Sequence, residues 1–319
     1  MFDLIKLSLT GFDIVEMDRI VKHNKLQTNS KKDVIYYDND NTKNIRDGFF
    51  IRVTPKNKKV EIECSLHKFW NWRHIRRQVN HNVFTVKNAI DTLQLLSECT
   101  GVDVYRMKVT YYEIGLNLYL DNECSQYIDK MQAIGLFDNK KELYINPRYK
   151  GSTVLTTKFY NQIKRIYKVY DKGFEMIDKG QTTHIEANIL RIETIRKRVD
   201  KMTVKRLFSP SNLDGLIDAF FVDWRTLQFD GAISAPKGTH QWKIDISRSI
   251  LKNGVEKTLK DVAQKGKTPK QLRVIRKFIL SDWREFKKEI KVIKSLQEQE
   301  YREKLQNAVK SVIYTISVV

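Results

Sequence analysis

Apolar and polar residues alternate in short runs over the first 198 residues or so of the chain, and the runs are rich in β-branched and aromatic residues. Clusters of Asn, Asp, Gly and Lys separate them, as is typical of turns between β-strands. Interleaved helices and few prolines favour an α+β fold built on an antiparallel sheet with flanking helices. The pattern predicts strands at 2–9, 49–54, 59–67, 104–120, 163–170 and 184–196, and helices at 85–99 and 123–131.

After residue 209 the apolar residues recur with the period of a helix. Ser211 or Asn212 is a suitable N-cap for the first of these helices, because a short polar side chain satisfies free backbone N–H groups there. Basic amphipathic helices are predicted at 252–265, 268–280 and 283–312. The change of period predicts two parts: residues 1–209, and a basic, mainly helical region at 210–319 that binds DNA or mediates oligomerisation.

The net charge of the chain indicates which classes of partner it binds. The 319 residues hold 58 Lys+Arg against 38 Asp+Glu, a formal charge of +20. An excess of this size indicates a polyanionic partner, nucleic acid first and an acidic membrane surface second. The sequence shows no run of eighteen apolar residues, no secretory signal and no glycine-rich phosphate loop. We therefore expect a cytoplasmic protein without a membrane partner.

The segment at 59–67 alternates cleanly, with Glu61, Glu63, Ser65 and His67 on one face of the predicted strand. Hard divalent cations bind carboxylate oxygens and imidazole nitrogens, so this face is a candidate metal site. A solvated outer surface of an antiparallel sheet has the same composition.

A second acid, Glu113, shares a strand face with Gly115 and Asn117. Glycine in the middle of a strand often marks the close approach of a ligand or of another part of the protein. A β-bulge explains it equally well.

Tyr170 and Lys172 form a Tyr-x-Lys pair, and Tyr167 lies three residues before Tyr170. A nearby cation favours the phenolate, which can attack phosphorus in DNA and form a covalent phosphotyrosine. An ordinary edge-strand tyrosine gives the same short pattern. Farther along, Arg191 and Glu193 share a strand face, as an ion pair or as a phosphate contact that Glu193 holds in place.

In this order the segments resemble the replication initiators of filamentous phages and related plasmids, the gene-two/gene-ten-type branch of the HUH (rolling-circle) endonuclease superfamily. The resemblance covers about residues 1–210. It is carried by Val60-Glu61-Ile62-Glu63-Cys64-Ser65-Leu66-His67-Lys68, Asn80-His81-Asn82-Val83-Phe84-Thr85, Glu113-Ile114-Gly115-Leu116-Asn117, Tyr170-Asp171-Lys172 and Leu190-Arg191-Ile192-Glu193.

The resemblance implies an endonuclease and strand transferase that nicks origin DNA, stays bound to the 5′ end through tyrosine, and later rejoins the strand. It makes Tyr170 the nucleophile, in preference to Tyr167, and Lys172 its charged helper. It also implies Mg²⁺ or Mn²⁺ bound by Glu113. The remaining metal ligands are His67 and Glu61, with Glu63 and His81 as competitors, because this chain has one histidine where the superfamily has two.

Single-stranded origin DNA is the expected partner, together with host replication proteins in a bacterial cytoplasm. Trp70, Trp72 and Tyr111 are candidates for stacking on unpaired bases. Two alternatives stay open: a non-catalytic nucleic-acid-binding protein, and a mobilisation relaxase, which normally has a fuller histidine cluster. The expected phosphate contacts come from Lys68, Arg191, Arg273, Arg276 and Lys277.

Overall fold

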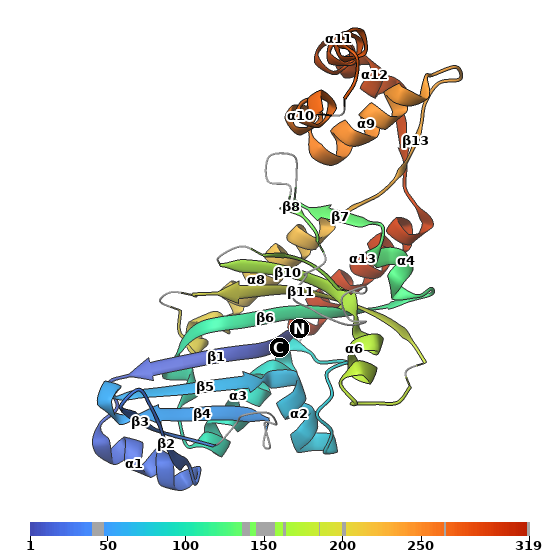
Figure 1. Cartoon of the computed structure of the whole chain (residues 1–319). Helices are drawn as coiled ribbons and strands as arrows, with labels where there is room; N and C mark the ends of the chain where they lie inside the picture. The colour runs from blue at the N-terminus through green and yellow to red at the C-terminus, as the bar shows by residue number, and fades with distance from the viewer. Residues whose placement is uncertain are drawn as a thin grey trace. The chain divides into compact units, whose positions relative to one another are not determined.

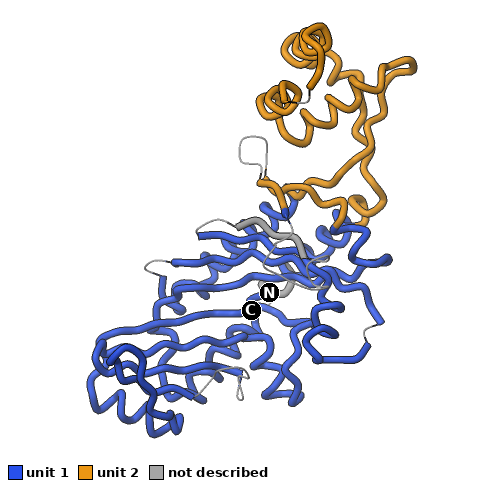
Figure 2. The backbone as a smooth tube through the Cα atoms, viewed as in Figure 1, with its two compact units in different colours: residues 1–128, 144–225, 301–319 blue, residues 129–143, 226–300 orange. Residues whose placement is uncertain are grey.

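A nine-stranded sheet lies at the centre of the larger of two compact units (Figure 1; Figure 2). The computed structural model describes residues 1–39, 48–135, 141–144, 157–161, 164–184, 186–199, 202–264 and 266–317. The strand order is β2-β3-β4-β5-β1-β6-β11-β10-β9, and all neighbours are antiparallel. The strands are β1 (Phe2–Thr10), β2 (Gln27–Lys31), β3 (Val34–Asp38), β4 (Phe49–Thr54), β5 (Lys59–Ser65), β6 (Lys108–Leu120), β9 (Thr157–Asn161), β10 (Arg165–Asp171) and β11 (Asn188–Lys197).

The two faces of this sheet differ in chemistry because side chains alternate along each strand. On β6, Tyr112, Ile114 and Leu118 are buried on one side, which we call the apolar face. The opposite side, which we call the polar face, carries the charged and amide side chains of the same strands. Its members on β6 and β11 are Tyr111, Glu113, Gly115, Asn117, Arg191 and Glu193.

Two helices far apart in the sequence cover the apolar face: α8 (Pro210–Arg225) and α13 (Leu296–Ser317). Trp224 of α8 is fully buried, and its indole N–H donates to the Thr194 hydroxyl at 3.0 Å. Tyr301 of α13 is also fully buried and donates to the backbone carbonyl of Trp224 at 3.2 Å. The larger unit therefore includes residues 301–319 as well as 1–128 and 144–225.

Further helices connect the strands of the larger unit. Among them, α3 begins where the Thr85 hydroxyl and the Asn88 side chain form a capping box, and it ends at Gly101, whose φ of +66° suits glycine. These helices are α1 (Ile14–His23), α2 (Leu66–Ile75), α3 (Val86–Thr100), α4 (Cys124–Ile128), α6 (Lys172–Asp178) and α7 (Val204–Leu207), with 3₁₀ turns at Pro55–Asn57 and Val104–Arg106.

The smaller unit, residues 129–143 and 226–300, has its own apolar core. Ile250, Phe278 and Trp283 are buried there, and Phe278 makes edge contacts with three aromatic rings. Its elements are β7 (Met131–Ile134), β8 (Lys141–Glu142), β12 (Gln228–Phe229), β13 (Ala232–Ser234), α9 (Gln241–Asn253), α10 (Val255–Gln264), α11 (Pro269–Lys277), a π-helical turn (Phe278–Asp282), α12 (Trp283–Glu289) and β14 (Lys291–Ile293).

The structure confirms the predicted α+β class, with a large antiparallel sheet, flanking helices and a helical C-terminal region. Several local predictions are wrong. The strand predicted at 59–67 ends at Ser65, and helix α2 begins at Leu66. The helix predicted at 283–312 is interrupted by β14, and the strand predicted at 104–120 begins at Lys108, after the 3₁₀ turn at Val104–Arg106.

By packing, the chain divides at positions other than 209/210, because α8 and most of α13 belong with the sheet. The assignment of residues 210–319 to DNA binding or oligomerisation stays a prediction. No helix in the described part of the chain has the length and apolar character needed to span a membrane.

Candidate active site

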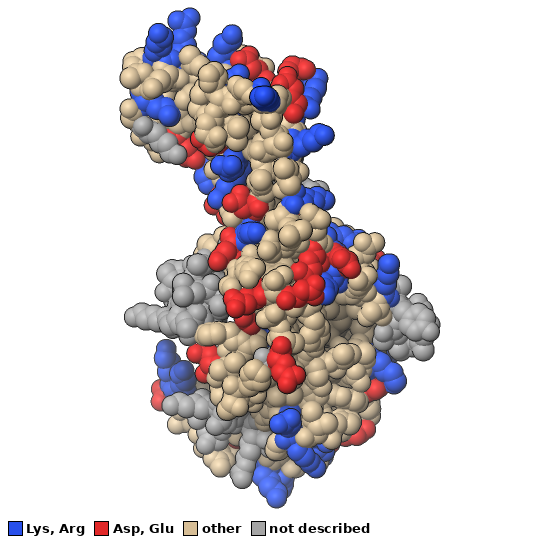
Figure 3. All heavy atoms as spheres, turned by 90° about the vertical axis from the view of Figure 1, so that its right-hand side faces the viewer, with Lys and Arg blue, Asp and Glu red and all other residues tan. Residues whose placement is uncertain are grey.

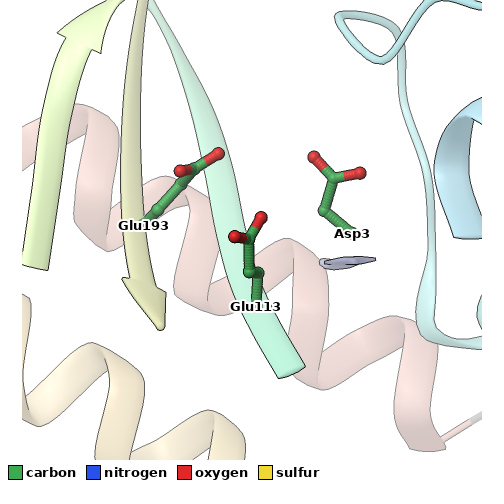
Figure 4. A group of neighbouring side chains, drawn as sticks. All are labelled: Asp3, Glu113 and Glu193. Atoms are coloured by element: carbon green, nitrogen blue, oxygen red, sulfur yellow. The ribbon is translucent and has the colours of Figure 1, made fainter. Parts of the chain in front are cut away.

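Three carboxylates from three adjacent strands meet on the polar face. Asp3 lies on β1, Glu113 on β6 and Glu193 on β11, and one oxygen of each lies within 4.8 Å of the others. Figure 4 shows the three carboxylates directed toward a common region. We call these residues the acidic trio. The strand order brings them together, since β6 pairs with both β1 and β11.

Arg191 neutralises two members of the acidic trio. Its guanidinium donates through Nη2 to Asp3 Oδ2 at 2.7 Å and through Nε to Glu193 Oε1 at 2.6 Å. It also donates to Asn117 Oδ1 at 3.0 Å, and its side chain is almost completely buried. The expected phosphate contact is therefore a buried side chain that holds carboxylates. Burial opposes the charged form of Glu193, but Lys168 and Arg191 outweigh it and lower the pKa of Glu193 below its usual value.

Gly115 makes this arrangement fit. A Cβ atom at position 115 would lie 2.7 Å from Arg191 Nη2 and 3.1 Å from Arg191 Cζ. The mid-strand glycine therefore marks the close approach of a neighbouring side chain, one of the explanations that its position allowed.

Tyr170 is connected directly to the acidic trio. Its hydroxyl donates to Glu193 Oε1 at 2.8 Å, and Lys168 pairs with Glu193 Oε2 at 2.6 Å. The ring centroid of Tyr170 lies 5.3 Å from the ammonium of Lys168 and 6.0 Å from that of Lys172. Burial and the negative charge of Glu193 raise the pKa of the Tyr170 phenol well above its usual value.

Tyr167 points to the other side of the sheet. Its ring makes an edge contact with Trp224 on the apolar face, and its hydroxyl donates to Asp223 at 2.9 Å. Burial raises the pKa of Tyr167 to about 12, although a hydrogen bond from Arg165 partly offsets the effect. Of the two candidate nucleophiles, Tyr170 is the one beside the acidic trio.

Lys172 is the first residue of α6, and its side chain is 1% exposed. Its ammonium forms an ion pair with Glu175 one turn along the helix. Burial lowers the pKa of Lys172, although the charge of Glu175 opposes the shift. Lys172 and Lys168 thus place two positive charges around the Tyr170 ring, and Lys168 was not among the expected site residues.

Glu61 lies apart from the acidic trio, whereas the charge of the buried His67 affects the pKa of Asp3. His67 is buried in α2, where it stacks on Phe84 and its Nε2 lies 2.7 Å from Asn82 Oδ1. Burial lowers the pKa of His67 to about 3. Glu61 pairs with Lys59 at 2.6 Å and lies opposite Ser8. Ser8 is five positions along β1 from Asp3, a separation of roughly 16 Å.

The other expected residues also have defined positions. Glu63 forms an ion pair with Lys6 at 2.7 Å, and the backbone carbonyl of His81 accepts from Asn117 at 2.9 Å. Lys68 is half-buried on α2. Figure 3 shows basic side chains on the visible surface of the smaller unit, with acidic ones among them. Arg273, Arg276 and Lys277 are exposed there on α11.

Sequence reasoning missed Asp3 as a site residue, and it expected Glu193 to pair with Arg191 or to hold it in place, not to bind a metal. A charged residue in the apolar start of a strand, Phe2-Asp3-Leu4-Ile5, was the signal for Asp3. Its carboxylate is 6% exposed, and it accepts hydrogen bonds from Ser65 and from Asn80, each at 2.7 Å.

The donor set of the acidic trio fits a hard divalent cation, since it consists entirely of carboxylate oxygens. Burial and the charge of Glu193 raise the pKa of Glu113 to about 7, although the charge of Lys168 opposes the shift. Among the described residues, Glu113 has a hydrogen bond from Tyr111 and no ion pair. The buried amide oxygen of Asn80, whose nitrogen binds Asp3, also has no hydrogen-bond partner there.

Comparison with known proteins gives a likeness in structure. No protein-family model matches the chain, and no curated protein matches it. Among solved structures, the chain is similar to a rolling circle replication initiator protein from Geobacillus stearothermophilus. The two share 12% sequence identity at a TM-score of 0.37, over 76% of this chain and 88% of the other.

Proposed function

We propose that the chain is a rolling-circle replication initiator, which nicks and rejoins one strand of origin DNA through Tyr170. One observation carries the proposal: the Tyr170 hydroxyl donates to Glu193, a member of a group of three carboxylates that suits a divalent cation. A tyrosine that is hydrogen-bonded to a group of metal-binding carboxylates suits phosphodiester transfer.

In the proposed reaction, Tyr170 Oη attacks the scissile phosphorus and forms a P–O bond. The P–O3′ bond breaks, its electron pair leaves with O3′, and a proton completes the 3′-hydroxyl. The phenol proton passes toward Glu193 Oε1, the atom that already accepts it. The reverse reaction, with a 3′-hydroxyl as nucleophile, rejoins the strand.

Positive charges around Tyr170 serve this chemistry. The ammonium groups of Lys168 and Lys172 lie 5.3 Å and 6.0 Å from the ring centroid, and positive charge there favours the phenolate and the phosphorane-like transition state. A Mg²⁺ or Mn²⁺ ion held by Asp3, Glu113 and Glu193 would polarise the scissile phosphate and offset its charge. Since Tyr170 is 6% exposed, the proposal requires surrounding groups to move when DNA binds.

A non-catalytic nucleic-acid-binding protein is the second candidate. Arg191 bridges Asp3 and Glu193, and Tyr170 and Lys168 complete the hydrogen bonds of Glu193. A buried network of ion pairs and hydrogen bonds of this kind also fits a structural role. The two functions therefore differ in whether Tyr170 becomes linked to DNA.

The test uses labelled single-stranded oligonucleotides that tile the replicon's candidate origin, with Mg²⁺ or Mn²⁺. The expected product is a protein–DNA adduct that survives denaturation and disappears with EDTA. Tyr170→Phe should abolish the adduct, whereas the matched variant Tyr167→Phe should keep it. If the wild type forms no adduct on any origin-derived strand, the nicking function is rejected and the non-catalytic function remains. An adduct formed by Tyr170→Phe would exclude Tyr170 as the nucleophile.

A further inference from the structure

Five residues cross the polar face in a line beside the acidic trio. The strand pairings place Phe50 on β4, Glu63 on β5, Lys6 on β1, Tyr111 on β6 and Lys197 on β11 directly opposite one another. We call them the cross-strand row. Cross-strand partners project from the same face, and the Tyr111 hydroxyl donates to Glu113 of the acidic trio.

Aromatic rings and cations alternate in and around this row. The guanidinium carbon of Arg52 lies 4.5 Å from the ring centroid of Tyr36 and 5.0 Å from that of Phe50. The ammonium of Lys6 lies 5.4 Å from the ring centroid of Tyr111. Each of these three rings is only partly buried, so apolar ring surface remains exposed on a face that is otherwise polar.

The cations of this surface are largely neutralised. Lys6 pairs with Glu63 at 2.7 Å, and Arg52 pairs with Asp38 at 3.2 Å. Such a surface offers little net attraction to phosphates and more to flat, polarisable rings. Lys197 has no ion pair among the described residues, so one end of the row keeps a charge for a phosphate.

We infer that the cross-strand row, together with Tyr36 and Arg52, binds the single-stranded DNA that flanks the scissile phosphate. The inference rests on the proposed function, which brings a DNA strand to the acidic trio. Unpaired bases expose the faces that stack on aromatic side chains, whereas duplex bases do not. The three strand spacings from β4 to β6 span roughly 14 Å, which is enough for a few nucleotides.

The experiment measures the binding of a fluorescein-labelled oligothymidylate by anisotropy, without divalent cations. Tyr36→Ala and Phe50→Ala should each weaken binding about tenfold, because a base loses its stacking partner. Their salt dependence should match that of the wild type, whereas Lys197→Ala should reduce the slope of log K against log salt by about one.

Matched controls separate stacking from folding. Ile35 neighbours Tyr36 on β3, points to the opposite face and is 56% exposed, so Ile35→Ala should bind like the wild type. Tyr36→Phe keeps the ring and should also bind like the wild type. Unchanged thermal midpoints would show that the variants fold.

The outcomes for the surface and for the chemistry are distinguishable. Ring variants that bind as tightly as the wild type would overturn the inference, even if the wild type forms an adduct through Tyr170. Loss of binding in ring variants of a protein that forms no adduct would uphold the surface and reject the nicking function. Duplex DNA that binds as tightly as the single strand, and loses as much in the ring variants, would also overturn the inference.

Discussion

Substituting Gly115 by alanine tests the packing that positions Arg191. The added Cβ would lie 2.7 Å from Arg191 Nη2 and 3.2 Å from Glu193 Cγ, and both side chains are buried. Overpacking of a well-packed site costs about 1–3 kcal/mol. The lower backbone entropy of alanine in the unfolded chain returns about 0.5–1 kcal/mol. We therefore expect Gly115→Ala to lower the free energy of unfolding by about 1 kcal/mol, near the middle of the range that these two magnitudes allow.

Gly215 provides a matched control in the same unit. It lies in the interior of α8, and a Cβ there would meet no atom within 4 Å. Gly215→Ala should therefore raise the free energy of unfolding by about 0.5–1 kcal/mol, because alanine is the better helix former.

Urea unfolding followed by tryptophan fluorescence compares the two variants, and the adduct assay reports on the site. Opposite shifts of the unfolding midpoint for the same chemical change would support the reasoning. A Gly115→Ala variant as stable as the wild type, beside a stabilised Gly215→Ala, would show that Arg191 has room to move. If Gly115→Ala forms as much adduct as the wild type, the exact position of Arg191 is unimportant for the chemistry.

Three further predictions concern charge. Arg191→Met should destabilise the fold by about 3–5 kcal/mol in urea titrations, since it leaves the buried Asp3 without its cation and Glu193 with Lys168 alone; a near-normal midpoint would contradict this role. The pKa of His67 is about 3 in the fold and near 6.5 when unfolded, so the contribution of His67 to the free energy of unfolding should be constant above about pH 6.5 and fall below it. The loss is about 2 kcal/mol at pH 5, and it should be absent from the pH-dependent melting of His67→Gln. Mn²⁺ affinity, measured calorimetrically, should rise with pH and level off above about 7, where Glu113 loses its proton; a pH-independent affinity would remove Glu113 from the ligands.

Period-two alternation was enough to predict the central strands, because each has one face buried against helices and one face polar. The same pattern placed Glu113 and Tyr170 on strands. The sequence could not show that β1 lies between β5 and β6, so nothing local indicated that Asp3 lies beside Glu113. Neighbour relations in a sheet arise from packing of the whole domain, and they decide which carboxylates meet.

At His67 the local pattern predicted the wrong secondary structure. The alternation of β5 continues in sequence through His67, but the chain turns into α2 at Leu66, whose side chain is fully buried. Helix α2 then buries Phe69 and Asn71, and Asn71 binds Asn82 at 2.8 Å. Tertiary burial therefore decided the conformation of residues whose local pattern fits a strand.

The return of α13 to the sheet has a consequence for synthesis on the ribosome. Trp224 and the apolar face around it receive Tyr301 and Leu305, both fully buried, only after residues 226–300 have been made. Until then a growing chain holds an antiparallel sheet with part of its hydrophobic side uncovered, a state prone to aggregation. The main segment of the smaller unit is translated in that interval. The time that this takes sets the delay before α13 can cover the apolar face of the sheet.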